Sequence, residues 1–311
     1  MKKLRIVFMG TPDFAVPSLQ KLLDAGYDIA AVVTAPDKPA GRGMKMFGSA
    51  VKDFAVSRNL KILQPEKLKN LDFLSELKSL KADLQVVVAF RMLPEVVWNM
   101  PPMGTVNLHG SLLPQYRGAA PVNRVIMNSE TETGVTTFKL QHEIDTGHIL
   151  LQEKIKIGDS ETAGELHDRM KVVGAGLLLR TIDGLAEGSL EETPQSNLVL
   201  MSGDLELHYA PKISTETCEI VWEKNVSDIY NLVRGLSPHP TAFTFLNGKK
   251  LKIFKAEKEY GKPAEKPGER LTDNKSYLKF SCNNGYLHLK ELQLEGKKKM
   301  NIEDFLRGWR N

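Results

Sequence analysis

The segment LRIVFMGTPDFAVPSLQKLLDAGYDIAAVV, residues 4–33, decides the fold. It opens with a short apolar run that ends at Gly10-Thr11-Pro12-Asp13, after which apolar residues recur at helical spacing. Gly26 ends this helix, and the apolar run from Asp28 to Val33 is typical of a second buried strand. The order strand, helix, strand predicts a βαβ unit at the start of an α/β domain.

The same alternation continues through the first half of the chain. Strands are predicted at residues 61–63, 84–90, 104–109 and 133–140, and helices at 49–58, 72–80 and 160–188. The last helix begins with the capping box Thr162-x-x-Glu165. The first turn lacks the GxGxxG fingerprint, so we expect a Rossmann-like, mostly parallel sheet without a nicotinamide or flavin site.

A second domain is predicted beyond residue 189. Residues 188–197 are polar and contain Pro194, which is typical of a linker. Short strands are then predicted at 208–213, 220–222, 241–245, 251–256, 277–281 and 286–294, with one helix at 226–236. We therefore expect three parts: an α/β domain at 1–189, a linker at 190–206 and a smaller OB-like β-barrel domain at 207–311.

Composition narrows the class of protein. The chain has 311 residues, of which 41% are hydrophobic, and no apolar stretch is long enough to cross a bilayer or to form a secretory leader. We expect a cytoplasmic protein with no membrane contact. Cys218 and Cys282 are far apart and have no CxxC motif, so they are predicted to be small buried hydrophobes, with neither metal nor disulfide. The net charge of +4 falls wholly in residues 200–311, so the second domain is basic.

The stretch NLHGSLLPQYRGAAPVN, residues 107–123, is the strongest candidate for a functional site. Side chains alternate along a strand, so Asn107 and His109 share one face at the strand end. A Ser-Leu-Leu-Pro loop follows, and Gly118 and Pro121 mark a helix start. A strand histidine is more often a hydrogen-bonded core residue, and such a loop can be an ordinary turn. This stretch alone leaves both interpretations open.

Two further segments carry chemistry-bearing residues. Asp145-Thr146-Gly147 forms a tight loop between apolar strands, where the Asp145 carboxylate suits either turn capping or catalysis. Residues 34–50 form a long loop with Lys38, Arg42 and Lys45. Arg42 lies between two glycines, which suits contact with phosphate or another polyanion, and the alternative is an ordinary surface loop.

Together these motifs resemble the methionyl-tRNA formyltransferases, over nearly the whole chain. The resemblance rests on Asn107-x-His109, Ser111-Leu112-Leu113-Pro114, Arg117-Gly118-Ala119-Ala120-Pro121 and Asp145-Thr146-Gly147, with Gly10-Thr11-Pro12-Asp13-Phe14, Asp37-Lys38-Pro39 to Gly41-Arg42-Gly43, and Gly296-Lys297-Lys298. The SLLP and DTG motifs are shared with the wider folate-dependent formyltransferases and specify the chemistry. The basic loop and second domain specify the substrate.

The resemblance implies transfer of a formyl group from the co-substrate 10-formyltetrahydrofolate to the α-amino group of methionine on initiator tRNA, without a metal. Asn107 and His109 would donate hydrogen bonds to the oxygen that becomes negative, and one such donor contributes about 2.7–4 kcal/mol to transition-state stabilisation. Asp145 would orient His109 and take or relay the proton of the amine.

The resemblance also implies a folate site. Ser111, Leu112, Leu113 and Pro114 would hold the folate, and Phe90 would wall its pocket. The chain departs from the family here, because Phe90-Arg91 replaces a usual Tyr-Gly pair and His109-Gly110-Ser111 replaces His-Ala-Ser. The bulk and charge of Arg91 bear directly on the outline of the pocket.

For the tRNA partner, basic side chains are the expected phosphate contacts. They are Lys38, Arg42 and Lys45 on the loop, and Lys249, Lys250, Lys297, Lys298 and Lys299 on the barrel. We expect a monomer. A formyltransferase acting on an amino-sugar nucleotide is the main alternative, and the HGS form fits it slightly better. A formate-releasing hydrolase and a non-enzymatic RNA-binding module are the others. The Arg42 loop and the lysine-rich second domain favour tRNA.

Overall fold

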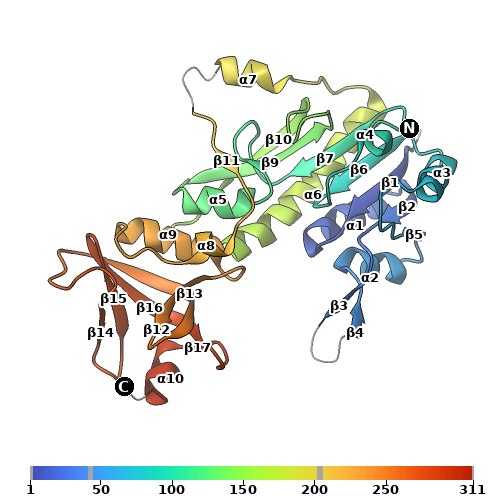
Figure 1. The fold of residues 1–311 in the computed structure, drawn as a ribbon. Coiled ribbons are helices and arrows are strands. Elements are labelled where there is room, and N and C mark those ends of the chain that lie inside the picture. Colours follow the sequence, from blue (N-terminus) through green and yellow to red (C-terminus); the bar gives the residue numbers. More distant parts are fainter. Residues whose placement is uncertain (1–2, 41–44, 202–205, 310–311) are drawn as a thin grey trace. The chain divides into compact units, whose positions relative to one another are not determined.

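The computed structural model describes residues 3–40, 45–201 and 206–309 (Figure 1). Contacts divide the chain into two compact units. The first unit comprises Met1–Arg117, Gly134–Ile155 and Asp168–Tyr209, and the second comprises Gly118–Thr133, Lys156–His167 and Ala210–Asn311. Two short segments that precede residue 189 therefore group with the carboxy-terminal strands.

The first unit is built on a seven-stranded sheet in the order β10-β9-β7-β6-β1-β2-β5. The strands are β1 Arg5–Gly10, β2 Asp28–Val33, β5 Ile62–Leu63, β6 Leu84–Val88, β7 Thr105–His109, β9 Glu132–Lys139 and β10 Ile149–Lys156. The helices are η1 Asp13–Ala15, α1 Val16–Asp24, α2 Ala50–Ser57, α3 Leu71–Ser79, α4 Glu95–Trp98, α6 Ala163–Glu187 and α7 Gln195–Met201. Strands β5, β2, β1, β6 and β7 are parallel and β9 runs antiparallel to β7, which confirms the predicted Rossmann-like, mostly parallel sheet.

Alternation along the strands decides which face each side chain occupies. Val7 and Met9 of β1 pack in one apolar cluster with Phe73 of α3 and Val97 of α4. On β7, Leu108 faces α6 so closely that a Cβ added at Gly174 would lie 2.9 Å from its Cδ2 atom. Asn107 and His109 therefore project from the opposite face of the sheet.

The order of the strands also marks where a ligand should bind. The chain runs outward from β1 to β2 and β5, then returns to β6 on the other side of β1. In open α/β sheets, ligands bind outside the carboxyl ends of the strands at such a switch point. Thr11 follows β1 and Ala89 follows β6, so these residues line this position.

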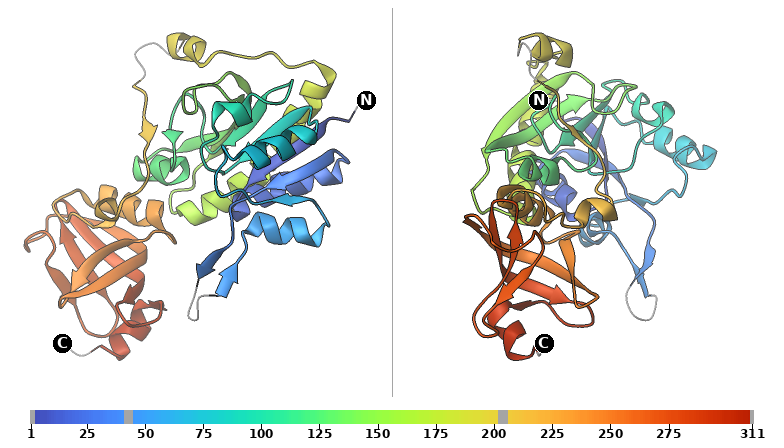
Figure 2. Two further views of the ribbon diagram at one scale, coloured as in Figure 1. Left: turned by 45° about the vertical axis from the view of Figure 1, so that its right-hand side comes forward. Right: turned by 60° about the vertical axis from the view of Figure 1, so that its left-hand side comes forward.

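Residues 34–50, predicted as an irregular loop, contain a hairpin of β3 (Lys38–Ala40) and β4 (Lys45–Phe47). Figures 1 and 2 show both strands extending away from the sheet. The Asp37 carboxylate accepts hydrogen bonds from Lys52 Nζ at 2.5 Å and Gln64 Nε2 at 2.9 Å, which lower the pKa of Asp37 and fix the base of the hairpin. Arg42 lies outside the described residues.

The second unit is an antiparallel β domain, whose strands β12 to β17 are orange to red in Figure 2. Its strands are β12 Ala242–Leu246, β13 Lys249–Tyr260, β14 Arg270–Thr272, β15 Leu278–Cys282, β16 Gly285–Leu294 and β17 Met300–Asn301, and its helices are α5 Pro121–Met127, α8 Thr215–Cys218, α9 Val226–Leu236 and α10 Ile302–Arg307. Strands β8 (Arg117–Gly118) and β11 (Tyr209–Ala210) form a separate pair. The main order is β12-β13-β16-β15-β14, with β17 on β16. Within the described residues the outer strands do not pair, so the predicted small β domain is a half-barrel.

The core of this domain contains both cysteines, as predicted. Cys218 is 4% and Cys282 1% exposed, and burial raises the pKa of the Cys282 thiol to about 12. Trp222 stacks on Phe280 at 4.6 Å between ring centroids. The strand predicted at 208–213 shortens to Tyr209–Ala210 because Pro211 has no N–H to continue the pairing. Among the described residues of the whole chain, no helix combines the length and apolarity that a membrane crossing requires.

Candidate active site

Strand β7 ends with the two polar residues that the sequence places on one face. Asn107 is opposite Val87 of β6 and Phe138 of β9, and its side chain is half-buried. The Asn107 side-chain amide makes no hydrogen bond with any residue that the structure describes. Its N–H donors are therefore available to a ligand.

His109 is buried and held by one backbone carbonyl. Its Nε2 lies 2.9 Å from the Tyr116 carbonyl oxygen. A carbonyl oxygen only accepts, so Nε2 carries the proton and donates it. Tyr116 has a positive φ of 59°, and its own N–H donates to the His208 carbonyl oxygen at 2.7 Å. In the neutral ring the other nitrogen, Nδ1, consequently presents a lone pair.

That lone pair faces Asp145. His109 Nδ1 and Asp145 Oδ2 are 3.9 Å apart, with 8% and 12% of the two side chains exposed. The distance exceeds the 2.7–3.2 Å range of a direct N–H···O hydrogen bond. Two proton-binding atoms thus converge from strand β7 and from the loop before β10. Of the three residues predicted to be catalytic, the structure places His109 and Asp145 opposite each other, and Asn107 lies two residues before His109 on the same strand.

The loop that carries Asp145 packs tightly against β9. Asp145 has a φ of +55°, in the left-handed region. At Gly147 an added Cβ would lie only 1.6 Å from the Lys139 carbonyl oxygen. Glycine is therefore required at residue 147 because two backbones approach each other there.

Residues 192–195, which we call the strap, are bound along this loop. The Glu192 carboxylate forms an ion pair with Lys139 Nζ at 2.5 Å and lies 3.3 Å from His148 Nδ1. These contacts lower the pKa of Glu192. Thr193 exchanges two backbone hydrogen bonds with Ile149, at 2.8 and 2.9 Å. The strap falls within the segment predicted as a linker at 190–206. In the structure it belongs to the first unit and is hydrogen-bonded beside the Asp145 loop.

Gln195, the first residue of α7, is a contributor that the sequence did not reveal. Its Nε2 donates to the carbonyl oxygens of Asp145 and Gly147, both at 2.8 Å. Its Oε1 accepts from Arg117 Nε at 3.0 Å and Arg117 Nη2 at 2.6 Å. Nothing local in the sequence indicates this, because Gln195 follows Pro194 in a polar stretch and lies 78 residues from Arg117.

The Ser-Leu-Leu-Pro loop is shaped mainly by its own buried groups. Ser111 Oγ donates to the Gln115 carbonyl oxygen at 2.6 Å, and Leu113 is 2% exposed in a cluster with Phe138 and Ile149. Gln152 Nε2 donates to the Leu113 carbonyl oxygen at 2.8 Å. The side chains of Ser111 and Leu113 thus support the loop. Leu112 and Pro114 are half-buried, and their side chains remain accessible from outside.

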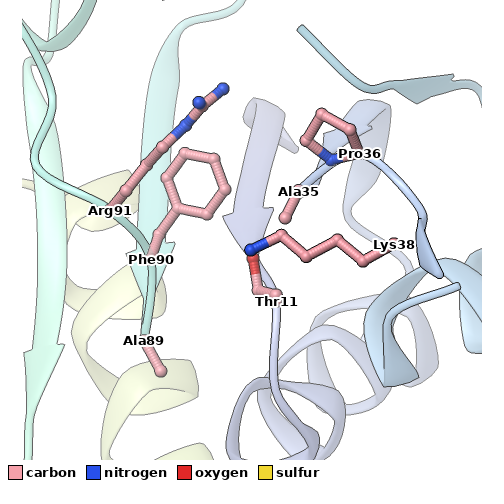
Figure 3. Close-up of a pocket in the computed structure, with 7 residues that line it drawn as sticks. All are labelled: Thr11, Ala35, Pro36, Lys38, Ala89, Phe90 and Arg91. Carbon is pink, nitrogen blue, oxygen red and sulfur yellow. The ribbon is translucent and has the colours of Figure 1, made fainter. Parts of the chain in front are cut away.

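A pocket of about 310 Å³ lies at the switch point of the sheet (Figure 3). It is lined by Thr11, Ala35, Pro36, Lys38, Ala89, Phe90 and Arg91. Phe90, predicted for folate, and Lys38, predicted for tRNA, therefore share one pocket. Register places Val88 opposite Leu108, so the pocket end of β6 adjoins the His109 end of β7.

Arg91 borders this pocket without filling it. Arg91 Nη1 donates to the Glu66 carbonyl oxygen at 2.7 Å, and Nη2 donates to that of Pro65. The guanidinium carbon lies 5.6 Å from the Phe90 ring centroid, and burial lowers the pKa of Arg91. Figure 3 shows the Arg91 side chain running alongside Phe90. The departure from the family's Tyr-Gly pair is thus accommodated by anchoring the arginine to residues 65–66.

The lysines predicted on the second domain gather at one end of its sheet. Leu251 of β13 pairs with Leu294 of β16, which brings the turn before β13 beside the turn after β16. The lysines at this end of the sheet are Lys249 and Lys250, which begin β13, and Lys297, Lys298 and Lys299, which follow β16. Lys250 Nζ lies 4.0 Å from the Phe243 ring centroid, and Lys299 pairs with Glu291 at 2.5 Å.

The other three lysines, Lys249, Lys297 and Lys298, are exposed and make no ion pair with any described residue. On the hairpin of the first unit, Lys38 is exposed and Lys45 begins β4.

Comparison with known proteins settles the family. The profile of the family described as "Formyl transferase" matches residues 4–182, and that described as "Formyl transferase, C-terminal domain" matches residues 212–310. The chain belongs to the formyltransferase family. A methionyl-tRNA formyltransferase of Parabacteroides distasonis is 53% identical over 318 residues, covering 100% of this chain and 98% of the relative. That of Phocaeicola vulgatus is 52% identical, covering 99% and 97%.

Solved structures share the fold of this formyltransferase. An N-formyltransferase from Helicobacter canadensis, solved with folinic acid and dTDP-3-aminofucose, has a TM-score of 0.68 at 20% identity, covering 96% of this chain and all of that chain. HypX from Aquifex aeolicus with tetrahydrofolic acid has a TM-score of 0.65 at 19% identity, covering 100% of this chain and 50% of HypX. At these identities the likeness concerns the fold. The chain is a formyl-transferring enzyme, and its full-length relatives place it with the methionyl-tRNA formyltransferases rather than with amino-sugar enzymes.

Proposed function

We propose that this enzyme transfers the formyl group of 10-formyltetrahydrofolate to the α-amino group of methionine on initiator tRNA, with Asn107, His109 and Asp145 as its catalytic residues. The main support is the convergence of His109 Nδ1 and Asp145 Oδ2 at 3.9 Å, with the Asn107 amide two residues before His109 on β7 and not hydrogen-bonded to any described residue. The names of the full-length relatives support the acceptor, and the folates in distant structural neighbours support the donor.

The reaction requires one oxyanion donor and one proton carrier. The amine nitrogen attacks the formyl carbon, a C–N bond forms, and the carbonyl oxygen becomes negative in a tetrahedral intermediate. The bond to folate N10 then breaks, so the amine loses a proton and N10 gains one. The Asn107 amide is suited to donate to the negative oxygen, a contribution of about 2.7–4 kcal/mol when such a donor is preorganised.

The hydrogen bonds of His109 refine the role predicted from the sequence. Its neutral ring has one N–H, at Nε2, and the Tyr116 carbonyl already accepts it. The neutral ring therefore has no proton left for the oxyanion. We assign the facing atoms, His109 Nδ1 and Asp145 Oδ2, as a joint acceptor that takes the amine proton and returns it to N10. Once Nδ1 is protonated, it can also donate to the oxyanion before the C–N10 bond breaks.

The folate is proposed to lie between the pocket and the Ser-Leu-Leu-Pro loop. Phe90 supplies an aromatic wall to the pocket, and the half-buried Leu112 and Pro114 supply apolar surface on the loop. Ser111 and Leu113 would act through the backbone that their side chains hold in place. These apolar surfaces suit a flat pterin ring and its linker. Backbone N–H and C=O groups would supply the hydrogen bonds that orient the ring.

The tRNA is proposed to contact the hairpin and the lysine cluster of the second domain. Lys38, Arg42 and Lys45 belong to the first surface, and Lys249, Lys250, Lys297, Lys298 and Lys299 to the second. Such contacts position a nucleic acid without reading its sequence. The cytoplasmic location and the monomeric state predicted from the sequence form part of this proposal.

The test is formyl transfer from 10-formyltetrahydrofolate to methionyl initiator tRNA, run beside a UDP-amino-sugar and an amine-free control. We expect transfer to the tRNA alone. His109→Ala and Asp145→Asn should each lower kcat by about 10²–10⁴-fold, with tRNA affinity within about twofold. His142→Ala is the matched control, because that histidine side chain is 83% exposed. Formyl transfer to the sugar, or formate release without an amine, would contradict the proposal that methionyl initiator tRNA is the acceptor.

A further inference from the structure

Gln195 is buried at the back of the Asp145 loop, where its amide is fully used. The residue is 3% exposed. Its two N–H groups donate to the carbonyl oxygens of Asp145 and Gly147, and its oxygen accepts two N–H groups of Arg117. An amide has two donors and two acceptor lone pairs, so all four positions are satisfied. The orientation of the amide is unambiguous, since arginine only donates and carbonyls only accept.

This arrangement fixes the two ends of the turn that presents the Asp145 carboxylate. The backbone at Asp145 has a φ of +55°, a conformation that an aspartate adopts only when its surroundings hold it. The N–H groups of Gln195 donate hydrogen bonds to the carbonyl oxygens at both ends of the turn. Arg117 donates to the Gln195 side-chain oxygen and so holds the amide in place. The carboxylate thereby keeps its place opposite His109 Nδ1.

We propose that Gln195, braced by Arg117, is a positioning residue of the formyl-transfer reaction that acts through Asp145. The inference rests on the proposed function, because it presupposes that the Asp145 carboxylate takes part in proton transfer. Gln195 itself contacts the loop backbone rather than the reacting atoms. Its loss should therefore lower the rate of the chemical step and leave substrate binding in place.

The substitution Gln195→Glu separates this role from simple packing. A glutamate keeps the length and volume of the side chain and retains acceptors for Arg117. It removes both N–H donors and sets carboxylate oxygens against the carbonyls of Asp145 and Gly147. A packing role would survive this change, whereas a positioning role would not, because the turn must move away from the carboxylate.

The first measurement is steady-state formyl transfer to methionyl initiator tRNA. We expect Gln195→Glu to lower kcat by about 10–100-fold, since a misplacement of about 1 Å can cost about 10²-fold in rate, with KM for both substrates within about twofold. Hydrogen exchange of the peptide covering residues 143–149 should accelerate. Thr181→Val is the matched control. It removes the 2.7 Å hydrogen bond to Thr137 in the same unit without touching the loop, and its kcat should stay within about twofold.

The decisive measurement is a double-mutant cycle under single-turnover conditions with enzyme in excess, which resolves slow variants. In an Asp145→Asn background, Gln195→Glu should cost less than about twofold, because the carboxylate through which it acts is absent. An equal loss in both backgrounds, or an unchanged kcat in the single variant, would overturn the inference while leaving the proposed function intact. Full transfer by Asp145→Asn alone would instead overturn the catalytic role of Asp145.

Discussion

The substitution Gly147→Ala tests how closely the geometry of the Asp145 loop controls the reaction. A Cβ at residue 147 would lie 1.6 Å from the Lys139 carbonyl oxygen, whereas real Cβ contacts stay beyond 3.0 Å, so the loop must move by about 1.4 Å. Strand β9 cannot yield in its place, because Lys139 is paired with Val106 in the sheet and its N–H donates to the His148 carbonyl oxygen.

The size of this movement sets the expected loss. A displacement of about 1.4 Å would stretch a 2.8 Å bond of Gln195 well beyond the 2.7–3.2 Å range of an N–H···O hydrogen bond. It would also change the 3.9 Å separation of His109 Nδ1 and Asp145 Oδ2. Because a misplacement of about 1 Å can cost about 10²-fold in rate, we expect kcat to fall by about 100-fold or more. Overpacking should also cost about 1–3 kcal/mol of stability.

Gly176→Ala supplies the control for this prediction. It is the same chemical change in helix α6, and an added Cβ at residue 176 meets no atom within 4 Å. Alanine in a helix interior is favoured over glycine by about 0.5–1 kcal/mol, so this variant should be at least as stable as the parent. Transfer assays are run well below both unfolding temperatures. If Gly147→Ala keeps a kcat within threefold of Gly176→Ala, the loop geometry does not govern the chemistry.

Three further outcomes are expected. Hydrogen bonds from the Thr162 N–H and hydroxyl lower the pKa of Glu165 in the folded protein. The ionised Glu165 therefore stabilises the fold at pH values above the ordinary carboxyl pKa of about 4.3, and this stabilisation is lost as the pH falls through the lowered pKa of the folded state. The unfolding temperature of Glu165→Gln should therefore be lower than that of the parent at pH 7, and the difference should disappear in acid. A difference that stays the same at all pH values would contradict this prediction. Lys297 and Lys298 form no ion pair within the described part of the chain, and replacing both with Gln should weaken tRNA binding and reduce its salt slope by about 1 per lost phosphate contact. An unchanged slope would remove these two lysines from the tRNA interface. The Cys282 thiol, with its pKa raised to about 12 by burial, should resist a disulfide reagent at pH 8 until the protein unfolds, and rapid labelling would contradict this.

Much of the fold followed from local sequence patterns. The predicted helix at residues 226–236 coincides with α9, and the predicted capping box is present, with Thr162 N and Oγ1 each 2.8 Å from a Glu165 carboxylate oxygen. Apolar runs predicted β1 and β6, because strands buried on both faces have no polar side, and the buried second half of β2 was predicted in the same way. These signals succeed where the physical cause lies within a few residues of the effect.

The predictions that needed more than local information were less complete. The hairpin of β3 and β4 lies in a stretch rich in proline and glycine, which favours a loop, and its pairing depends on only three register positions. Placing Asp145 beside His109 relied on the family resemblance, since 36 positions of sequence separate them and only the fold joins them. Lys249 and Lys297 meet at one sheet end for the same reason, through the pairing of β13 with β16.

Gln195 shows why the remainder of the site was out of reach. The sequence near it reads as a linker, because a polar stretch with a proline offers no apolar face to bury. Its importance comes from what it contacts, namely two backbone carbonyls and one guanidinium, and backbone carbonyls leave no mark in a sequence. His109 is held in the same manner, since its Nε2 proton goes to the Tyr116 carbonyl.

Both proton-binding residues are thus oriented by groups that later parts of the chain hold in place. Tyr116 donates its N–H to the His208 carbonyl, and the Asp145 turn is gripped by Gln195. The residues that follow α6 in the first unit therefore supply the constraint, while β7 and the turn before β10 supply the catalytic groups. Gln195 contributes through its arrangement of donors and acceptors, so Gln195→Glu, conservative in size, should be more damaging to catalysis than many larger changes on the surface.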